Sequence, residues 1–299
     1  LFFFKVNRLY SLMKAVQGKV VLKPDRIFDR FKVLFTDVFG QSNVRRKRMP
    51  GFAHTLIFFG FLAVQPHSLE LMVRGVFPGF RPAAWFPGLY GAYMFAADIL
   101  AFLVLFGLGY ALYRRLVIKP KYLTDGLDAR LIILFTAVII ITFHLINAFL
   151  MVTSISGGGF DYARYLTVSA AVHSLLSLND LSMGAARIGF EAFYWIHILT
   201  ILGFLIYIPG SKHLHLLAAA PNVFLKPLQR PKPMITTDIE DEAAESFGLG
   251  KVSELNWKHV LDLYACTECG RCEEQCPADM TDKPLSPKRI IQDTRHDLF

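Results

Sequence analysis

The residues from 131 to 152 read LIILFTAVIIITFHLINAFLMV, a run of 22 residues without a charged side chain. A run of this length and composition is long enough to cross the hydrocarbon core of a bilayer as an α-helix. The rest of the chain agrees, since 54% of its 299 residues are hydrophobic and its mean hydropathy is +0.40. Because a spanning helix satisfies its own backbone hydrogen bonds, the composition predicts an all-α membrane protein rather than a soluble domain.

Three further stretches have the same character. They predict complete spans at Gly51 to Val73, Gly88 to Tyr113 and Gly189 to Ile208. Leu1 to Phe4 is expected to be the last turn of a truncated first span, which gives a five-span helical bundle. The apolar segment from Tyr165 to Leu178 has 14 residues, too few for a span, so a re-entrant or interfacial helix is expected there.

Lys and Arg gather on one side of these predicted spans. They cluster at Arg45 to Arg48, Arg114 to Lys121 and Lys212 to Lys232, whereas the loops at 74–87 and 156–188 are nearly balanced in charge. Because cytoplasmic loops carry an excess of Lys and Arg, the three clusters are expected in the cytoplasm. The chain is therefore predicted to be a multi-pass protein of a bacterial or archaeal inner membrane, with a cytoplasmic carboxyl terminus. The net charge of +8 needs no nucleic-acid partner, and none is expected.

The four cysteines of the chain lie together near its end. The stretch from Cys266 to Pro277 reads CTECGRCEEQCP, which is C-x2-C-x2-C-x3-C-P. Thiolates are soft ligands, and this spacing is typical of cysteines that hold a [4Fe–4S] cluster. A disulfide framework and a zinc site both favour more widely separated cysteines, so they fit the run less well. Gly270 is expected to permit a sharp turn between the ligands.

The predicted cluster ligands are therefore Cys266, Cys269, Cys272 and Cys276. In two-cluster ferredoxins the fourth cysteine of such a run binds the second cluster. This sequence contains one such run. Cys276 either completes a single cluster or serves a second cluster in a chain that continues beyond Phe299.

Composition divides the chain into four predicted segments. The first combines the end of a span with a basic stretch whose apolar residues suggest an interfacial amphipathic helix. A short helix from Trp257 to Leu263 is expected to present the cysteines on the cytoplasmic side. The segments are the first span end and basic stretch at 1–50, the haem-binding membrane domain at 51–220, a linker at 221–256 and a ferredoxin-like iron–sulfur segment at 257–299.

Histidines inside spans are costly in lipid and are usually functional. Two imidazoles on facing helices can hold a b-type haem by axial ligation. His54 and His67 are 13 residues apart on the first complete span, roughly 20 Å along a helix. His197 on the last span and His215 beyond it are 18 residues apart, roughly 27 Å. Because the two helices run in opposite directions, His54 pairs with His215 and His67 with His197, which predicts two haems.

Three further polar residues are candidates in the same region. His144 lies in the outer half of its span and is the alternative to His67 as a haem ligand. Asp98 lies inside the second complete span, where it either makes a structural hydrogen bond or delivers protons to a quinone. His213 is a further candidate for quinone protonation, because imidazole titrates near neutral pH.

Several stretches resemble known membrane oxidoreductases. The layout of the spans and the gap from His197 to His215 are similar to the nitrate reductase gamma-subunit-like cytochrome b domain. Its fusion to the cysteine run resembles the heterodisulfide reductase D subunit and, more closely, iron–sulfur oxidoreductases of the electron transfer flavoprotein–menaquinone oxidoreductase type. The matching stretches are GFAH at 51–54 through Gly60-Phe61, Asp98 through Arg115, WIH at 195–197, PGSKHLH at 209–215, and Ala265 to Pro277 with LSP at 285–287.

This resemblance implies a quinone-linked oxidoreductase. Electron transfer flavoprotein, a soluble donor, would supply electrons to the iron–sulfur cluster, and menaquinone would accept them after two b haems held by the four histidines. Such proteins carry two [4Fe–4S] motifs followed by cysteine-rich domains, and this sequence holds the first motif. The alternatives are the same wiring serving a heterodisulfide, sulfur-cycle or hydroxy-acid dehydrogenase module, and a non-catalytic membrane anchor subunit. Further subunits are also candidate partners.

Overall fold

The computed structural model describes residues 1–16, 25–123, 126–154, 163–228, 240 and 251–298. All regular elements in these residues are helical, as the sequence predicts. They form two compact units. We refer to Val44–Ile118 with Ala129–Leu205 as the membrane unit, and to Leu1–Asn43, Lys119–Asp128 and Ile206–Phe299 as the cysteine unit.

Four helices are long and apolar enough to cross a membrane, at Arg48–Val76, Pro87–Ile118, Leu127–Val152 and Met183–Gly210. These four helices coincide with the complete spans that the sequence predicts, and most of their ends lie a few residues outside the predicted bounds. Leu1 to Phe4 was expected to be the last turn of a truncated first span, but this expectation is wrong, because the helix that begins there, Phe2–Ala15, continues beyond Phe4 to Ala15. A first span, and with it a bundle of five spans, stays a prediction.

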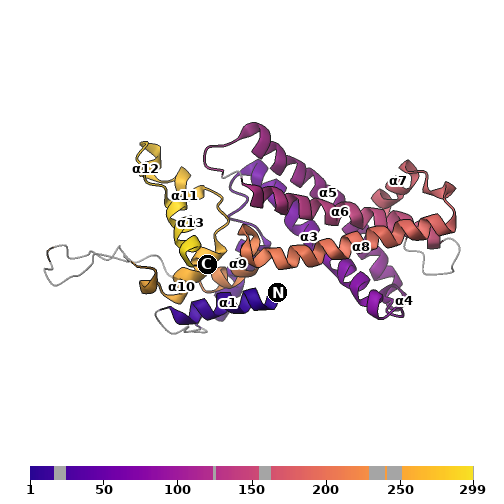
Figure 1. The fold of residues 1–299 in the computed structure, drawn as a ribbon, viewed down its shortest axis with the longest axis horizontal. Helices are drawn as coiled ribbons and strands as arrows, with labels where there is room; N and C mark the ends of the chain where they lie inside the picture. The colour runs from indigo at the N-terminus through magenta and orange to yellow at the C-terminus, as the bar shows by residue number, and fades with distance from the viewer. Residues whose placement is uncertain (17–24, 124–125, 155–162, 229–239, 241–250, 299) are drawn as a thin grey trace. The chain divides into compact units, whose positions relative to one another are not determined.

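The membrane unit combines these long helices with short ones (Figure 1). A nine-residue helix forms in the apolar segment that the sequence analysis judged too short for a span. The turn after α5 is a π-helix, Arg114–Ile118. The helices are α3 (Arg48–Val76), α4 (Pro82–Trp85), α5 (Pro87–Tyr113), α6 (Leu127–Ser154), α7 (Thr167–Leu175) and α8 (Met183–Tyr207).

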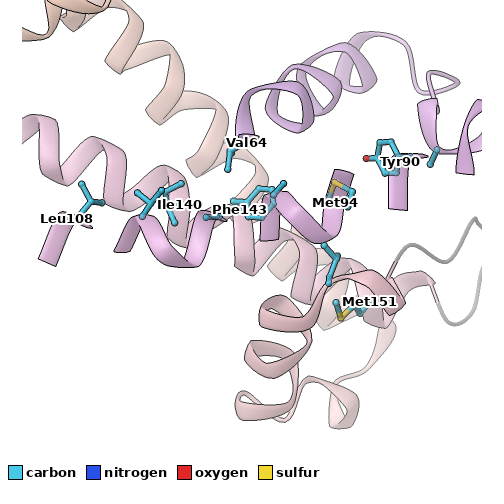
Figure 2. Close-up of a cluster of buried hydrophobic side chains, with 12 residues drawn as sticks. Val64, Tyr90, Met94, Leu108, Ile140, Phe143 and Met151 are labelled. Carbon is cyan, nitrogen blue, oxygen red and sulfur yellow. The ribbon is translucent and has the colours of Figure 1, made fainter. Parts of the chain in front are cut away.

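The main core of this unit lies between α3, α5 and α6. Its buried side chains form a row along these helices (Figure 2). The backbones of α3 and α5 come close at two glycines: a Cβ on Gly60 would lie 2.8 Å from the Leu100 carbonyl oxygen, and one on Gly107 would lie 2.8 Å from that of Ala53. Small residues permit such close packing, which holds helices together in lipid. The labelled members of the row are Val64, Tyr90, Met94, Leu108, Ile140 and Phe143, and Met151 of the same cluster lies to one side of it.

Two smaller apolar clusters attach α8 to the unit. One joins α3, α6 and α8 through Leu71, Ile146 and Ile198. The other joins the end of α6 to the start of α8, where Ala148 and Ala186 are both fully buried. Each of the four long helices therefore contributes side chains to a shared interior.

The cysteine unit has a separate core around α10 (Trp257–Ala265), which packs against α1, α9 and α13. The sequence-based helix from Trp257 to Leu263 is therefore confirmed and ends two residues later. The core residues are Leu9, Leu214, Ala218, Val260, Leu261 and Tyr264. The other helices are α1 (Phe2–Ala15), α2 (Ile27–Leu34), α9 (His215–Phe224), α11 (Arg271–Glu274), α12 (Pro277–Met280) and α13 (Pro287–Leu298).

Two sequence-based segments can be compared with this unit. The linker was expected to start at residue 221, but α9 continues through Pro221 to Phe224, and 229–239 and 241–250 lie outside the described residues. The basic stretch contains α2 and a π-helical turn, Phe35–Phe39. Its exposed rings fit the predicted interfacial helix, whose contact with lipid stays a prediction. The exposed rings are Phe28, Phe31, Phe35 and Phe39.

Candidate metal and cofactor sites

The cysteine segment begins where α10 ends, with Cys266 directly after the last helical residue. Glu268 and Gly270 then adopt positive φ angles of 56° and 74°, so the chain turns sharply twice. A Cβ at Gly270 would lie 2.3 Å from the carbonyl oxygen of Tyr122, so the position also needs glycine for space. The turn that the sequence predicts at Gly270 is therefore confirmed.

All four thiols are free. Cys269 and Cys272 are exposed, and Cys266 and Cys276 are half-buried. In the described part of the chain, no three His, Cys, Asp or Glu side chains converge as they would around a single metal ion. Each cysteine of an iron–sulfur cube binds a different iron, so its ligands need not converge on one point. The donor set and the tightly turned backbone fit such a cluster.

A guanidinium lies beside one of these thiols. Arg271 Nε is 3.4 Å from Cys269 Sγ, and Arg271 also donates to the Asn43 carbonyl oxygen at 2.8 Å. Although Cys269 is exposed, the protein atoms around its thiol partly exclude water and act to raise its pKa, but the hydrogen bonds and charge of Arg271 bring that pKa below its usual range. At Cys266, burial raises the pKa. Arg271 therefore favours the thiolate form of Cys269, which is the form that binds metals.

A buried ion pair holds the same segment against α13. Glu273 is 8% exposed, accepts a hydrogen bond from Ser286 Oγ at 2.5 Å and pairs with Lys288 Nζ at 2.8 Å. Burial acts to raise the pKa of Glu273, but these two partners lower it overall. Because Glu273 follows Cys272 directly, the pair anchors the middle of the cysteine run.

Arg295 of α13 attaches the cysteine segment to the turn that precedes α9. Its guanidinium donates to the carbonyl oxygen of Ser211 at 2.8 Å and to that of Cys266 at 3.3 Å. One side chain thus contacts the backbone of both segments. The first predicted cluster ligand is thereby held next to the turn that leads to His215.

Lys212 makes a second link and orients the His215 ring. Its Nζ lies 3.3 Å from Glu268 Oε2, and its carbonyl oxygen lies 3.1 Å from His215 Nδ1. A carbonyl oxygen only accepts, so Nδ1 carries the ring proton and Nε2 keeps the lone pair that binds metals. Burial lowers the pKa of His215, which favours this neutral form. The His213 ring packs edge-on against it, with ring centroids 5.0 Å apart.

In the membrane unit, His67 lies where the hydrogen-bond ladder of α3 is interrupted. Pro66 has no N–H to donate. The N–H of His67 donates to the Tyr93 hydroxyl at 2.9 Å, and that hydroxyl donates to the Ala63 carbonyl oxygen at 2.9 Å. A hydroxyl from α5 is therefore inserted into the ladder of α3, which fixes the backbone of His67 against α5.

Tyr90 and Glu70 contact the ring of His67. Tyr90 donates its one hydroxyl proton to Glu70 Oε2 at 2.5 Å. Its oxygen can therefore only accept from His67 Nδ1, 3.3 Å away. Glu70 Oε2 is itself 3.7 Å from Nδ1. Nδ1 thus carries the proton, and His67 Nε2 is buried without a hydrogen-bond partner among the described residues.

His197 is fully buried on α8. Its Nδ1 is 2.8 Å from Thr142 Oγ1, whose proton goes to the Val138 carbonyl oxygen at 2.6 Å, so Nδ1 is the donor. Its Nε2 accepts from Ser68 Oγ at 3.1 Å. Because Ser68 follows His67 in the chain, the structure brings the predicted pair His67 and His197 to one place, each with a lone pair on Nε2.

His144 and Asp98 form a second buried pair, with Nδ1 3.2 Å from Oδ1. Asp98 also accepts from the N–H groups of Val168 and Ser169, at 2.6 and 3.2 Å, and from the Ser169 hydroxyl at 2.6 Å. That hydroxyl oxygen in turn accepts from His144 Nδ1 at 3.1 Å. Nε2 of His144 is therefore also buried without a hydrogen-bond partner in the described part of the chain.

The predicted residues thus divide between the units. His67, His197, His144 and Asp98 lie in the membrane unit, whereas the cysteines, His213 and His215 lie in the cysteine unit. His54 lies on α3, and its pairing with His215 stays a sequence-based prediction. Glu70 was not among the residues predicted from the sequence, although an acid three residues after a histidine inside a predicted span is a visible signal.

The chain is similar to two curated oxidoreductases and, over a short stretch, to a ferredoxin. It is 34% identical to a probable iron-sulfur-binding oxidoreductase FadF of Bacillus subtilis (strain 168), over 89% of this chain and 37% of that protein. It is 28% identical to an EtfAB:quinone oxidoreductase of Syntrophomonas wolfei, over 98% of this chain and 40% of that protein. A probable membrane-anchored ferredoxin of Chromohalobacter salexigens is 42% identical over 18% of this chain and 8% of that protein. No family model and no solved structure matches the chain.

The chain spans about two fifths of the length of the first two relatives. Their names support an iron–sulfur oxidoreductase that takes part in electron transport, as the sequence predicts. The four long apolar helices agree with a membrane protein. The resemblance to the nitrate reductase gamma-like cytochrome b domain stays an expectation.

Proposed function

We propose that the chain transfers electrons within a membrane, from a soluble flavoprotein of the electron transfer flavoprotein class to menaquinone. The observation that carries this proposal is the double attachment of the cysteine segment to the His215 turn, through Arg295 and through the pair of Lys212 and Glu268. It joins predicted cluster ligands to a predicted haem ligand within one unit. The name of one relative, EtfAB:quinone oxidoreductase, supports a flavoprotein donor and a quinone acceptor.

The residues of the chain suit the groups that this function needs. The four cysteines would hold the [4Fe–4S] cluster, and His67 with His197 and His54 with His215 would hold two b haems, with His144 as the alternative ligand. Clusters and haems supply one-electron transfer, whereas a quinone takes up two electrons and two protons. At His67, His197 and His215, hydrogen bonding leaves Nε2 as the lone-pair nitrogen, which is the state that binds iron.

The remaining polar residues would orient groups and handle protons. Asp98 accepts hydrogen bonds from the first turn of α7 and from His144, which supports a positioning role, and its part in quinone protonation stays a prediction. His144 presents a buried Nε2 and is the better candidate to exchange a proton with a quinone. His213 stays a second candidate. Under this proposal the basic segments and the cysteine unit face the cytoplasm.

The first test is a reduced-minus-oxidised absorption spectrum of the purified full-length protein, with haem and iron counted per chain. Two b haems are expected, and His67→Ala is expected to remove one. His173→Gln is the matched control, because His173 is buried but both of its ring nitrogens contact protein oxygens at 2.8 Å. A folded protein without haem would overturn the proposal that electrons pass through haems in this chain. It would favour a second candidate, a membrane-anchored iron–sulfur carrier, as the name of the third relative suggests.

A second test addresses the attachment itself. Arg295→Ala removes both contacts that join Ser211 to Cys266. Slower reduction of the haems through the cluster is expected, with unchanged haem and iron content. Arg289→Ala, an exposed change on the same helix, is the control. Equal rates in both variants would show that the attachment does not serve electron transfer.

A further inference from the structure

Glu70 is a buried acid that the proposed function does not use. It is 6% exposed on α3, one of the four long apolar helices. A carboxylate at such a place is costly and is retained when partners stabilise it. Its partners are the Tyr90 hydroxyl at 2.5 Å, the Arg74 guanidinium at 3.6 Å and His67 Nδ1 at 3.7 Å. Two of these three contacts lead to the His67 ring.

The carboxylate decides which nitrogen of His67 carries the proton. A tyrosine hydroxyl has one proton, and Tyr90 gives it to Glu70 at the shorter of its two contacts. Without Glu70, the same hydroxyl could donate to Nδ1, and the ring proton would then move to Nε2. A ring protonated on Nε2 has no lone pair there for a metal.

The other contacts leave His67 little freedom. Tyr93 holds its backbone, as described above, and Phe143 packs edge-on against its ring with centroids 5.5 Å apart. Tyr90 and Phe143 both belong to the row of buried side chains in Figure 2. With Nδ1 engaged by Tyr90, Nε2 is the ring nitrogen that remains for a ligand.

We propose that Glu70 is a positioning residue for His67. Through Tyr90, Glu70 holds the ring with Nε2 unprotonated, and it makes that nitrogen a stronger electron donor to a b haem. The inference rests on the proposed function for the haem. Carboxylates that contact a metal-bound histidine raise the basicity of the ligand in general. Because oxidised iron carries one more positive charge than reduced iron, a nearby carboxylate stabilises the oxidised form and lowers the midpoint potential.

The test is a redox titration of the haem absorption bands in the wild-type protein and in Glu70→Gln. Glutamine keeps the shape and an oxygen that can accept from Tyr90, but it removes the charge. The midpoint potential of one haem is expected to rise, with about a tenfold change in its ratio of reduced to oxidised form, which is ~59 mV for one electron. The other haem is expected to stay unchanged.

One other acid of the membrane unit serves as a control. Glu191 is an exposed acid on α8 that pairs with Arg187 at 2.9 Å. Glu191→Gln is expected to change the same ratio less than twofold. An equal rise in Glu70→Gln and Glu191→Gln would show a general charge effect and overturn the specific role of Glu70.

A second measurement reads the tautomer and needs no haem. In protein labelled with ¹⁵N at histidine, the signal that disappears in His67→Gln is expected to show a proton on Nδ1. Tyr90→Phe removes the hydroxyl that accepts from His67 Nδ1, so a mixture of the two His67 tautomers is expected in this variant. A His67 ring protonated on Nε2 in the wild-type protein would overturn the positioning role.

The two measurements separate the possible failures. Wild-type haems with no shift in Glu70→Gln would overturn this inference and leave the proposed function intact. A folded wild-type protein without haem would overturn the haem wiring and, with it, the electron-donating role of Glu70. The positioning role would then be decided by the tautomer alone.

Discussion

Two buried histidines of the membrane unit, His67 and His144, have similar contacts at their ring nitrogens, but the residues that hold the two rings are arranged differently. Each ring has Nδ1 directed at a buried carboxylate and Nε2 without a hydrogen-bond partner among the described residues. At His67 the acid lies on the same helix, three residues away, and acts mainly through Tyr90. At His144 the acid comes from another helix, α5, and most of its contacts go elsewhere.

The two carboxylates differ in the groups that they contact, which indicates different roles. Asp98 accepts from two N–H groups and one hydroxyl at the start of α7, so it takes the place of an N-cap residue supplied by a neighbouring helix. Glu70 holds no backbone group in the described contacts and is engaged by side chains alone. We therefore expect Asp98 to matter most for stability, and Glu70 to matter most for the state of His67.

The largest effect is expected when Asp98 is truncated. Asp98→Ala leaves the N–H groups of Val168 and Ser169 without their acceptor and should lower the free energy of unfolding by about 3 kcal/mol. Glu70→Ala should cost about half as much, because its partner Arg74 is partly exposed. Chemical unfolding in detergent, followed by circular dichroism, measures both. Equal losses would contradict the division of roles, and Glu191→Ala should change little.

Loss of the Tyr90 hydroxyl comes next. Tyr90→Phe removes a hydrogen bond to a carboxylate and leaves His67 Nδ1 without its acceptor, so a loss of about 2 kcal/mol is expected. Tyr113→Phe, at an exposed tyrosine of the same helix, is the control. The same unfolding experiment applies. A Tyr90→Phe protein as stable as this control would show that the ring of His67 is held by packing alone.

Ser169 is the corresponding hydroxyl at the His144 site. Ser169→Ala removes the hydroxyl that donates to Asp98 and accepts from His144, but the two N–H contacts to Asp98 remain. A loss of about 1.5 kcal/mol is expected for that reason. Ser174→Ala, at an exposed position of the same helix, should stay within about 0.5 kcal/mol of the wild-type protein. Equal stabilities of Ser169→Ala and Ser174→Ala would show that the Ser169 hydroxyl does not stabilise α7.

The smallest effect is expected at the inserted hydroxyl of Tyr93. In Tyr93→Phe, the His67 N–H can bond the Ala63 carbonyl oxygen directly once α3 straightens, so the loss should be about 1 kcal/mol. The tautomer of His67, read by ¹⁵N spectroscopy, should not change, because Tyr90 and Glu70 are untouched. A changed tautomer would show that backbone and ring are not held independently.

Much of the fold could be read from the sequence. Runs of apolar residues predict the four long helices because length and composition alone decide whether a helix can cross a bilayer. The cysteine run predicts the ligands of a metal site because its spacing is local, and the left-handed turn at Gly270 agrees. The helix that begins at Trp257 was likewise predicted from the sequence, and the structure differs only in its last two residues.

Tertiary structure decided what the buried polar residues contact. The sequence left two roles open for Asp98, and only the packing of α5 against α7 shows that it accepts hydrogen bonds from Val168 and Ser169. Glu70 was overlooked because its importance depends on Tyr90, twenty residues away on another helix. A hydrogen bond between two helices depends on the depth of both residues along their helices, on the rotation of each helix about its axis and on the distance between the helices. The sequence of one helix does not determine these three quantities. The sequence therefore determined which segments are long and apolar enough to cross a membrane and where the thiols gather. The tertiary structure decided which ring nitrogen of His67 and of His144 has no hydrogen-bond partner among the described residues.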